Sequence, residues 1–139
     1  MATKVRDIMT GSPTSVSPEL DLVTVARTMR DEDIGNVLVM DGDDLQGVVT
    51  DRDLVIRGVA GGLDPRTTKI GGLCSSVTAT VAPDDDLDKA VGLMRDRAIR
   101  RLPVLDDGRP VGIISIGDLA LEKDPRSALA HISAAKPNL

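Results

Sequence analysis

The chain of 139 residues contains no phenylalanine, tyrosine or tryptophan. Its core must therefore be aliphatic, and a bound base would find no aromatic ring to stack on. Cysteine is almost absent as well, since Cys74 is the only one, which excludes an internal disulfide framework and is typical of the reducing cytoplasm. The single histidine, His131, lies in the C-terminal tail. We therefore predict no nucleophile–histidine pair in the core, no transition-metal site and no enzyme activity.

Long apolar runs and a positive net charge are also missing. No apolar run approaches the roughly 20 residues that span a bilayer, and no apolar segment of a signal peptide follows the N-terminal Met-Ala-Thr-Lys-Val-Arg. The net charge of −5 argues against binding to nucleic acid or to an anionic membrane surface. These absences predict a cytoplasmic protein with no nucleic-acid and no membrane partner. The 41% hydrophobic and 28% charged residues are typical of a globular chain.

The sequence is duplicated. At an offset of 65 residues, 13 of the 39 residues from 16 to 54 are identical to those from 81 to 119. Each copy contains a β-prone stretch, an amphipathic helix, two apolar strand-like stretches separated by a turn, and a second helix. The pattern predicts β-α-β-β-α twice, which is an α+β fold. The predicted boundaries are repeat 1 at 4–57, a linker at 58–68, repeat 2 at 69–122 and a C-terminal tail at 123–139.

The first helix of each copy carries an apolar stripe at helical spacing. The stripes are Leu22, Val25, Ala26 and Met29 in the first copy, and Leu87, Ala90, Val91 and Met94 in the second. In the first copy we predict Ser17 as the N-cap and Pro18 as the first helical residue. In the second copy Ala82 cannot cap with its side chain, so we expect the acids at 84–86 to compensate by facing the positive end of the helix dipole.

A further sequence motif lies at the end of the second predicted strand of each copy. A glycine, two aliphatic residues and a hydroxyl residue are followed three positions later by an aspartate, giving Thr50 with Asp53 and Ser115 with Asp118. The next helix directs its free N–H groups at the hydroxyl, which is a favourable place for a phosphate. An ionised aspartate only accepts hydrogen bonds and therefore suits the two hydroxyls of a ribose. The alternative is that each aspartate is only a helix cap.

These motifs resemble those of the CBS-domain pair, also called a Bateman module. The resemblance covers roughly residues 4–122, and it is carried by the duplicated motif, by the strand motif Arg100–Asp106 and by the lead-in Val5–Met9. It implies two CBS repeats around a pseudo-two-fold axis, and a homodimer formed through the first helices. It also implies a regulatory sensor that binds an adenosine-type nucleotide (AMP, ADP, ATP or a related compound) in the cleft between the repeats. Such a sensor needs no obligatory cofactor and would signal to a separate effector protein.

The resemblance implies two ligand sites, one in each copy, that differ in their residues. Arg101 precedes the strand of the second copy, where it can reach a phosphate, whereas Asn36 stands there in the first copy. Asp51 adds negative charge to the first site. We therefore expect the second copy to bind a phosphorylated ligand better. The predicted ligand-binding residues are Arg101, Ser115, Asp118, Thr80, Thr50, Asp53, Asn36 and Val16.

Other interpretations stay open. The chain is alternatively a dimeric protein-interaction module with vestigial ligand sites, which an absence of nucleotide binding would favour. Cys74 aligns with the apolar lead-in residue Met9, which favours a packed side chain over a redox switch. The acidic turn at 41–44 is more typical of a solvated turn than of a cation site.

Overall fold

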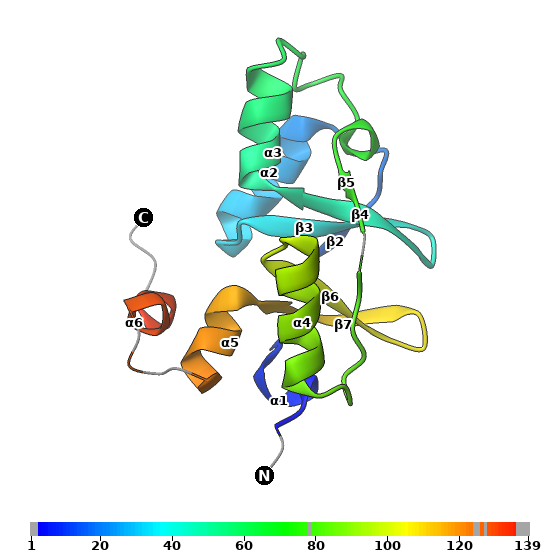
Figure 1. The fold of residues 1–139 in the computed structure, drawn as a ribbon. Coiled ribbons are helices and arrows are strands. Elements are labelled where there is room, and N and C mark those ends of the chain that lie inside the picture. The colour runs from blue at the N-terminus through cyan, green and yellow to red at the C-terminus, as the bar shows by residue number, and fades with distance from the viewer. Residues whose placement is uncertain (1–2, 78, 124–125, 127, 136–139) are drawn as a thin grey trace. The chain divides into compact units, whose positions relative to one another are not determined.

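The computed structural model describes residues 3–77, 79–123, 126 and 128–135 (Figure 1). The chain forms two compact units. Pro13–Val77 carries the first repeat and is called the first-repeat unit below. Met1–Ser12 together with Thr78–Leu139 carries the second repeat and is called the second-repeat unit. Each unit combines helices with a β-sheet, so the predicted α+β class is confirmed.

The first-repeat unit contains a four-stranded sheet in the order β2-β3-β4-β5. Its elements are β2 (Ser15–Val16), α2 (Leu22–Glu32), β3 (Asn36–Asp41), β4 (Asp44–Thr50), α3 (Asp51–Asp53), the π-helix η1 (Leu54–Val59), the 3-10 helix η2 (Ile70–Gly72) and β5 (Ser75–Ser76). Strand β3 runs parallel to β2 and antiparallel to β4. The core lies between α2 and this sheet, where Val25, Val37 and Val49 are fully buried.

The second-repeat unit contains a three-stranded sheet in the order β1-β7-β6. Its elements are α1 (Val5–Ile8), β1 (Thr10–Gly11), α4 (Leu87–Arg97), β6 (Arg101–Asp106), β7 (Arg109–Ser115), α5 (Ile116–Lys123) and α6 (Ala128–Ala134). Val5, Ala90, Leu102 and Ile114 are fully buried in its core. Helix α6 belongs to the predicted tail, whose residues 124–125, 127 and 136–139 lie outside the described part of the chain.

The structural elements repeat at the same offset as the sequence. Helix α4, strand β6 and strand β7 each begin and end 65 residues after α2, β3 and β4. Both first helices also end at a residue in the left-handed conformation, Asp33 with φ 55° and Ala98 with φ 53°. The first strand of the second copy is a single parallel bridge between Val81 and Val104, and Thr78 of that predicted stretch lies outside the described residues. The β-α-β-β-α order is thus confirmed in both repeats.

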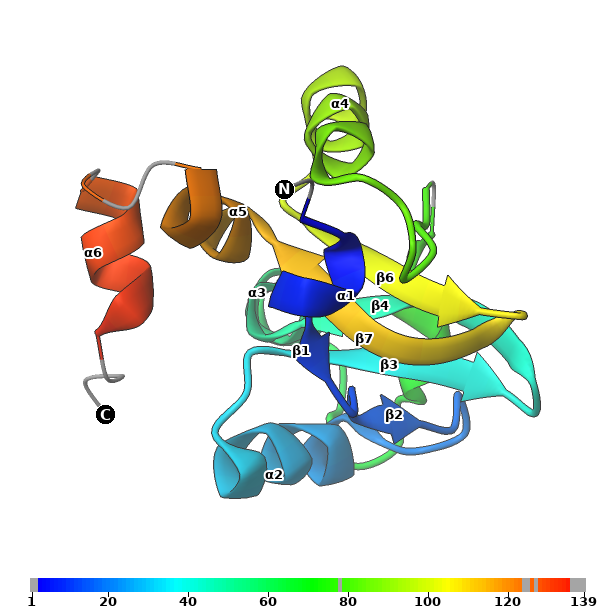
Figure 2. The same cartoon turned by 90° about the horizontal axis from the view of Figure 1, so that it is seen from below.

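The two repeats exchange their lead-in segments. Strand β1 lies in the lead-in of the first repeat but pairs with β7 of the second, and β5 lies in the lead-in of the second repeat but pairs with β4 of the first. Figure 2 shows β1 and α1 beside β7. Equivalent backbone bonds hold both segments, from Val5 N to Asp85 O at 2.9 Å and from Ile70 N to Leu20 O at 2.8 Å. The predicted boundaries 4–57 and 69–122 follow the sequence duplication. Each compact unit, by contrast, contains the lead-in segment of the other repeat.

The first helix begins later than the sequence predicts. Its N-cap is Asp21, whose Oδ1 accepts a hydrogen bond of 2.8 Å from the backbone amide three residues on. The prediction of Ser17 and Pro18 as the helix start is wrong. Pro18 O accepts a hydrogen bond from Gly71 N of the exchanged lead-in at 3.0 Å, and Ser17 forms a turn instead. The exchanged segment therefore holds this stretch outside the helix.

The aspartates that precede α4, the first helix of the second repeat, bind the exchanged lead-in segment. Lys4 Nζ lies 2.6 Å from Asp86 Oδ1, and Arg6 Nε donates to Asp84 Oδ1 at 2.9 Å. Asp86 is the N-cap of α4 but forms no side-chain cap hydrogen bond. These carboxylates thus fix the lead-in, and their expected interaction with the helix dipole stays a prediction. No helix in the described part of the chain is long and apolar enough to cross a membrane.

Candidate functional site

The candidate site lies in the second-repeat unit, where β6 begins and β7 ends. Arg101 and Ser115 are register partners in this antiparallel pair, so the two residues lie side by side. Helix α5 starts at the next residue, Ile116, whose backbone N donates to Arg100 O at 2.9 Å. The register therefore brings two basic residues and a hydroxyl to the N-terminal end of an eight-residue helix.

Asp118 is bound to Ser115 by two reciprocal hydrogen bonds. Ser115 N donates to Asp118 Oδ2 at 2.9 Å, and Asp118 N donates to Ser115 Oγ at 3.2 Å. This is the arrangement of a capping box. Within the described residues, nothing accepts the hydroxyl hydrogen of Ser115 and nothing donates to Asp118 Oδ1. One donor and one carboxylate oxygen thus stay free for a ligand.

A cavity of about 330 Å³ opens at this point. Its lining residues are Arg100, Arg101, Ser115, Ile116, Gly117 and Leu129. Neither Arg100 nor Arg101 forms an ion pair or a side-chain hydrogen bond with any residue that the structure describes. The volume lies at the lower end of the range for small-molecule sites, roughly 300–1,000 Å³. Two unpaired guanidinium groups beside a hydroxyl and a helix start favour an anionic ligand.

The corresponding place in the first-repeat unit is built from different groups. Asn36 and Thr50 are register partners there. The Thr50 hydroxyl donates to Asp53 Oδ2 at 3.1 Å, and the other Asp53 oxygen lies 3.8 Å from Arg57 Nε. A Cβ added at Gly35 would lie only 3.3 Å from Asp51 Oδ2, so a carboxylate is adjacent. The first site is therefore acidic, and its hydroxyl is already engaged.

The structure places the remaining predicted ligand residues apart from this cavity lining. Val16 is buried in the core of the first-repeat unit. Thr80 is half-buried and precedes Val81, whose backbone bridges to Val104 of β6. The lining residues Ile116, Gly117 and Leu129 were not predicted. Leu129 lies outside the duplicated sequence, so no repeat signal could have identified it.

Cys74 packs against the first-repeat sheet. Its Sγ donates to Gly71 O at 3.5 Å, and burial raises the pKa of the thiol above its usual value. A Cβ added at Gly47 would lie 2.8 Å from this sulfur. The thiol therefore serves as a small packed group. Among the described residues, no group of three or more histidine, cysteine, aspartate or glutamate side chains could hold a metal ion.

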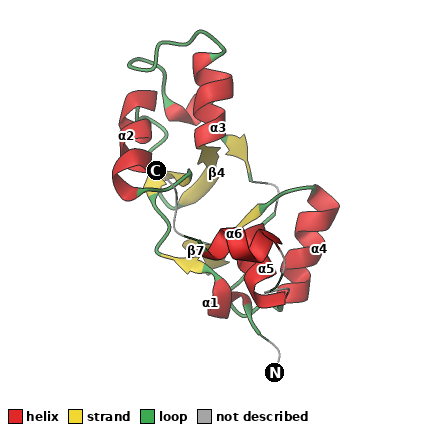
Figure 3. Cartoon of the chain, turned by 90° about the vertical axis from the view of Figure 1, so that its left-hand side faces the viewer, coloured by secondary structure: helices red, strands yellow, loops and turns green. Residues whose placement is uncertain are grey.

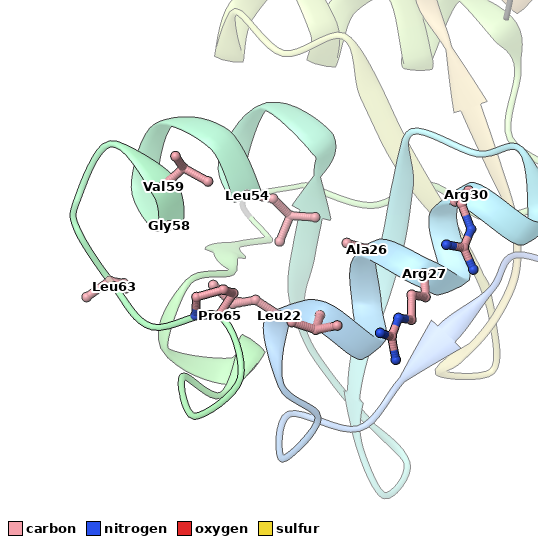
Figure 4. Close-up of a pocket in the computed structure, with 10 residues that line it drawn as sticks. Leu22, Ala26, Arg27, Arg30, Leu54, Gly58, Val59, Leu63 and Pro65 are labelled. Carbon is pink, nitrogen blue, oxygen red and sulfur yellow. The ribbon is translucent and has the colours of Figure 1, made fainter.

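A second hollow, the apolar groove, lies on the first-repeat unit (Figure 4). Its volume is about 310 Å³, and it runs between α2, η1 and the loop that follows η1. Leu22, Leu54 and Val59 contribute aliphatic surface, and Ala26 of the predicted helical stripe is exposed here rather than buried. Val59 is 72% exposed. An exposed aliphatic side chain beside an apolar hollow makes this groove a candidate interaction site.

The chain is similar to known CBS-domain proteins over most of its length. The family model described as CBS domain matches residues 5–58 and 70–123. Hypoxic response protein 1 of Mycobacterium tuberculosis is 38% identical over 133 residues, which cover 95% of this chain and 93% of that protein. The CBS domain-containing protein YhcV of Bacillus subtilis is 35% identical over 133 residues, which cover 93% of this chain and 94% of that protein.

Solved structures show the same architecture. A crystal structure of Hypoxic Response Protein I, which contains two coordinated zinc ions, matches with a TM-score of 0.75 at 38% identity and covers 85% of this chain and 97% of that one. The CBS-domain pair of protein MJ0100, in complex with 5′-methylthioadenosine and S-adenosyl-L-methionine, matches with a TM-score of 0.79 and covers 91% of this chain and 100% of that one. At 22% identity the second likeness shows the fold alone.

Proposed function

The chain belongs to the CBS-domain family, and on that premise we propose that it is a regulatory sensor of an adenosine-type nucleotide. AMP, ADP, ATP and related compounds form the proposed ligand class. The observation that carries the proposal is the pair of unpaired guanidinium groups, Arg100 and Arg101, beside the cavity of the second-repeat unit. The paired residues of the first repeat, Gly35 and Asn36, carry no charge.

The phosphate is proposed to lie between the two arginines and the start of α5. Arginine offers several N–H donors in a planar fork that suits phosphate oxygens. The Ser115 hydroxyl has a hydrogen to donate, because among the described residues its only hydrogen bond is the one that its oxygen accepts from Asp118 N. The first N–H groups of a helix have no partner within the helix and add a partial positive charge. These donors together favour a mono- or polyphosphate over a neutral ligand.

The ribose is proposed to bind Asp118. Its Oδ2 is held by the Ser115 amide at 2.9 Å, which orients the carboxylate and leaves Oδ1 to accept from hydroxyl groups. Asp53 in the first repeat is less available, because Arg57 Nε lies 3.8 Å from its Oδ1 and the Thr50 amide and hydroxyl both donate to its Oδ2. The second repeat is therefore the stronger proposed site, and the first is weak or empty.

The proposed ligand class also has support from a protein of the same fold. The CBS-domain pair of MJ0100 holds 5′-methylthioadenosine and S-adenosyl-L-methionine, both of which contain adenosine. The proposed role is binding without catalysis, since CBS-domain proteins are generally regulatory modules and the one histidine of this chain lies outside the two matched segments. The free thiol of Cys74 supports a cytoplasmic location, where thiols stay reduced. The signal is proposed to pass to a separate effector protein.

Isothermal titration calorimetry with AMP, ADP, ATP, NAD and S-adenosylmethionine tests the proposal. We expect at least one nucleotide to bind, with a dissociation constant about tenfold or more higher for Asp118→Ala and unchanged within about twofold for the matched variant Asp53→Ala. At 100 times its dissociation constant, a bound ligand should add about 2.7 kcal/mol of stability. Undiminished binding to Asp118→Ala contradicts the site. Absence of binding by every nucleotide contradicts the function and favours a protein-interaction module.

A homodimer formed through the apolar groove completes the proposal. The groove is lined in part by α2, the first helix of repeat 1, and by the exposed Val59. Val55 and Ile56, on the same helix as Val59, are exposed as well. Light scattering during gel filtration should give twice the chain mass of 14.6 kDa. Val59→Asp should give the monomer mass, because a charge in an apolar interface is costly. Ile132→Asp, at a similarly exposed position in α6, should leave the dimer intact. A dimer that survives Val59→Asp contradicts this interface.

A further inference from the structure

Helix α6 supplies one wall of the proposed nucleotide site, although it lies outside both segments that match the CBS domain. Leu129, in the first turn of α6, lines the cavity together with Arg101 and Ser115. Figure 3 shows α6 beside α5, and the two helices contact each other. The tail of the chain is therefore part of the site and not only an extension of the fold.

The cavity combines two kinds of surface. Arg100, Arg101 and Ser115 present cations and a hydroxyl, whereas Ile116 and Leu129 present aliphatic side chains. Ile116 is 44% exposed and Leu129 41% exposed, so both retain apolar surface that a ligand can cover. A ligand that matches both surfaces has an anionic end and a flat, weakly polar end. A nucleotide fits this description, whereas a sugar phosphate fits only the charged part.

Because the chain lacks aromatic residues, aliphatic side chains such as Ile116 and Leu129 must provide the contacts to a bound base. The chain has no ring on which a base could stack, so a bound base must pack against aliphatic side chains. In the first repeat, the residue at the 65-residue offset from Ile116 is the exposed Asp51. Leu129 lies outside the duplicated sequence and has no counterpart there. Ile116 and Leu129 thus distinguish the cavity of the second repeat from the corresponding place in the first.

We propose that Leu129, together with Ile116, packs against the base of the ligand and makes the site select nucleotides over phosphate compounds that lack a base. This inference rests on the proposed function, since it assigns a specificity residue to the same site. Leu129 acts by apolar contact with the ligand and takes no part in holding the phosphate. Its removal should therefore change the selectivity of the site rather than its affinity for phosphate.

Calorimetry with AMP and with ribose 5-phosphate, which has no base, separates the two surfaces. We expect Leu129→Ala to raise the dissociation constant of AMP about tenfold and to leave that of ribose 5-phosphate unchanged within about twofold. Leu129→Met retains an apolar side chain of similar volume and should bind AMP as the natural chain does. Ile132→Ala is the matched control, because Ile132 lies one turn further along α6, is 71% exposed and does not line the cavity.

Circular dichroism of each variant establishes that α6 and the rest of the fold persist. Unchanged AMP affinity in Leu129→Ala overturns the inference, even where Asp118→Ala still abolishes binding and the proposed function stands. An equal loss of affinity for AMP and ribose 5-phosphate also overturns it, because that result indicates a general structural effect. If the natural chain binds no nucleotide at all, the proposed function fails and the inference fails with it.

Discussion

The backbone amide of Ser115 donates a 2.9 Å hydrogen bond to Asp118 Oδ2, and Asp118 N returns one of 3.2 Å to Ser115 Oγ. The equivalent pair in the first repeat, Thr50 and Asp53, forms the same two bonds and a third, from the threonine hydroxyl to the carboxylate at 3.1 Å. The third bond uses the hydrogen that a phosphate would otherwise accept. A capping motif that is shared by both repeats thus leaves a free donor in the second repeat only.

Substitution of the two hydroxyl residues tests this difference. Ser115→Ala and Thr50→Ala should each lower the free energy of unfolding by about 1 kcal/mol, because each loses a helix-capping acceptor. Only Ser115→Ala should also weaken AMP binding, by roughly tenfold, because a hydrogen bond to a charged group contributes about 1.5 kcal/mol or more. Urea unfolding and calorimetry measure the two effects separately. Equal loss of AMP binding in both variants would contradict the assignment.

The glycine that opens each strand-end motif has a packing role. A Cβ on Gly112 would lie 2.6 Å from Met9 Sδ and 2.9 Å from Thr10 O, which belong to the exchanged lead-in. We predict that Gly112→Ala lowers the free energy of unfolding by about 1–3 kcal/mol, because the lead-in must move. Gly92→Ala is the control, since its Cβ meets only the end of a flexible arginine at 3.7 Å, and it should stabilise α4 by about 0.5–1 kcal/mol. Equal stability of the two variants in urea would refute the close approach.

The thiol of Cys74 should react slowly. Burial raises its pKa, and the neighbouring Asp53 carboxylate raises it further, so the thiolate fraction at pH 7.5 is small. Alkylation by iodoacetamide at pH 7.5 should be at least about tenfold slower in the folded protein than in the same protein in urea, and its rate should rise with pH above 8. A folded rate equal to the unfolded one would instead favour a reactive, redox-sensitive thiol.

The N-cap of α2 should make stability depend on pH. The backbone amide of Thr24 donates to the Asp21 carboxylate and lowers the pKa of Asp21 in the folded state below its ordinary value of 3.8. Its contribution is therefore fully present above pH 4 and is lost as the pH falls through the lowered folded value. Asp21→Ala should lower the melting temperature at pH 7, and the difference from the natural chain should shrink below pH 3.5. Asp43→Ala, in an exposed turn, should melt like the natural chain at both pH values.

The duplicated pattern was sufficient to predict the order of the elements. Periodicity and turn residues report local conformation, so α2, α4 and the paired strands fall where the sequence predicts them to within a few residues. The start of α2 at Asp21 rather than at Ser17 was not predictable in this way. Ser17 and Pro18 are good helix-start residues locally, but the tertiary hydrogen bond from Gly71 N to Pro18 O holds them in a turn.

The candidate site was predictable only where the sequence repeats. Ser115 and Asp118 stand out because their motif recurs at a fixed offset, and Arg101 because its counterpart Asn36 differs. The β6–β7 register does bring Arg101 beside Ser115. Leu129 has no counterpart of similar type, and its place in the cavity depends on how α6 packs against α5. Packing between helices that are joined by a loop depends on their tertiary contacts and leaves little trace in a single sequence.

Amide chemical shifts of the ¹⁵N-labelled chain, recorded during a titration with AMP, show residue by residue where the nucleotide binds. We expect the largest shifts at Arg101, Ser115, Ile116, Asp118 and Leu129, with smaller shifts at Asn36, Thr50 and Asp53. Shifts centred on Thr50 and Asp53, with the second repeat unaffected, would contradict the assignment of the phosphate and ribose site to the second repeat. No shift anywhere would contradict nucleotide sensing itself.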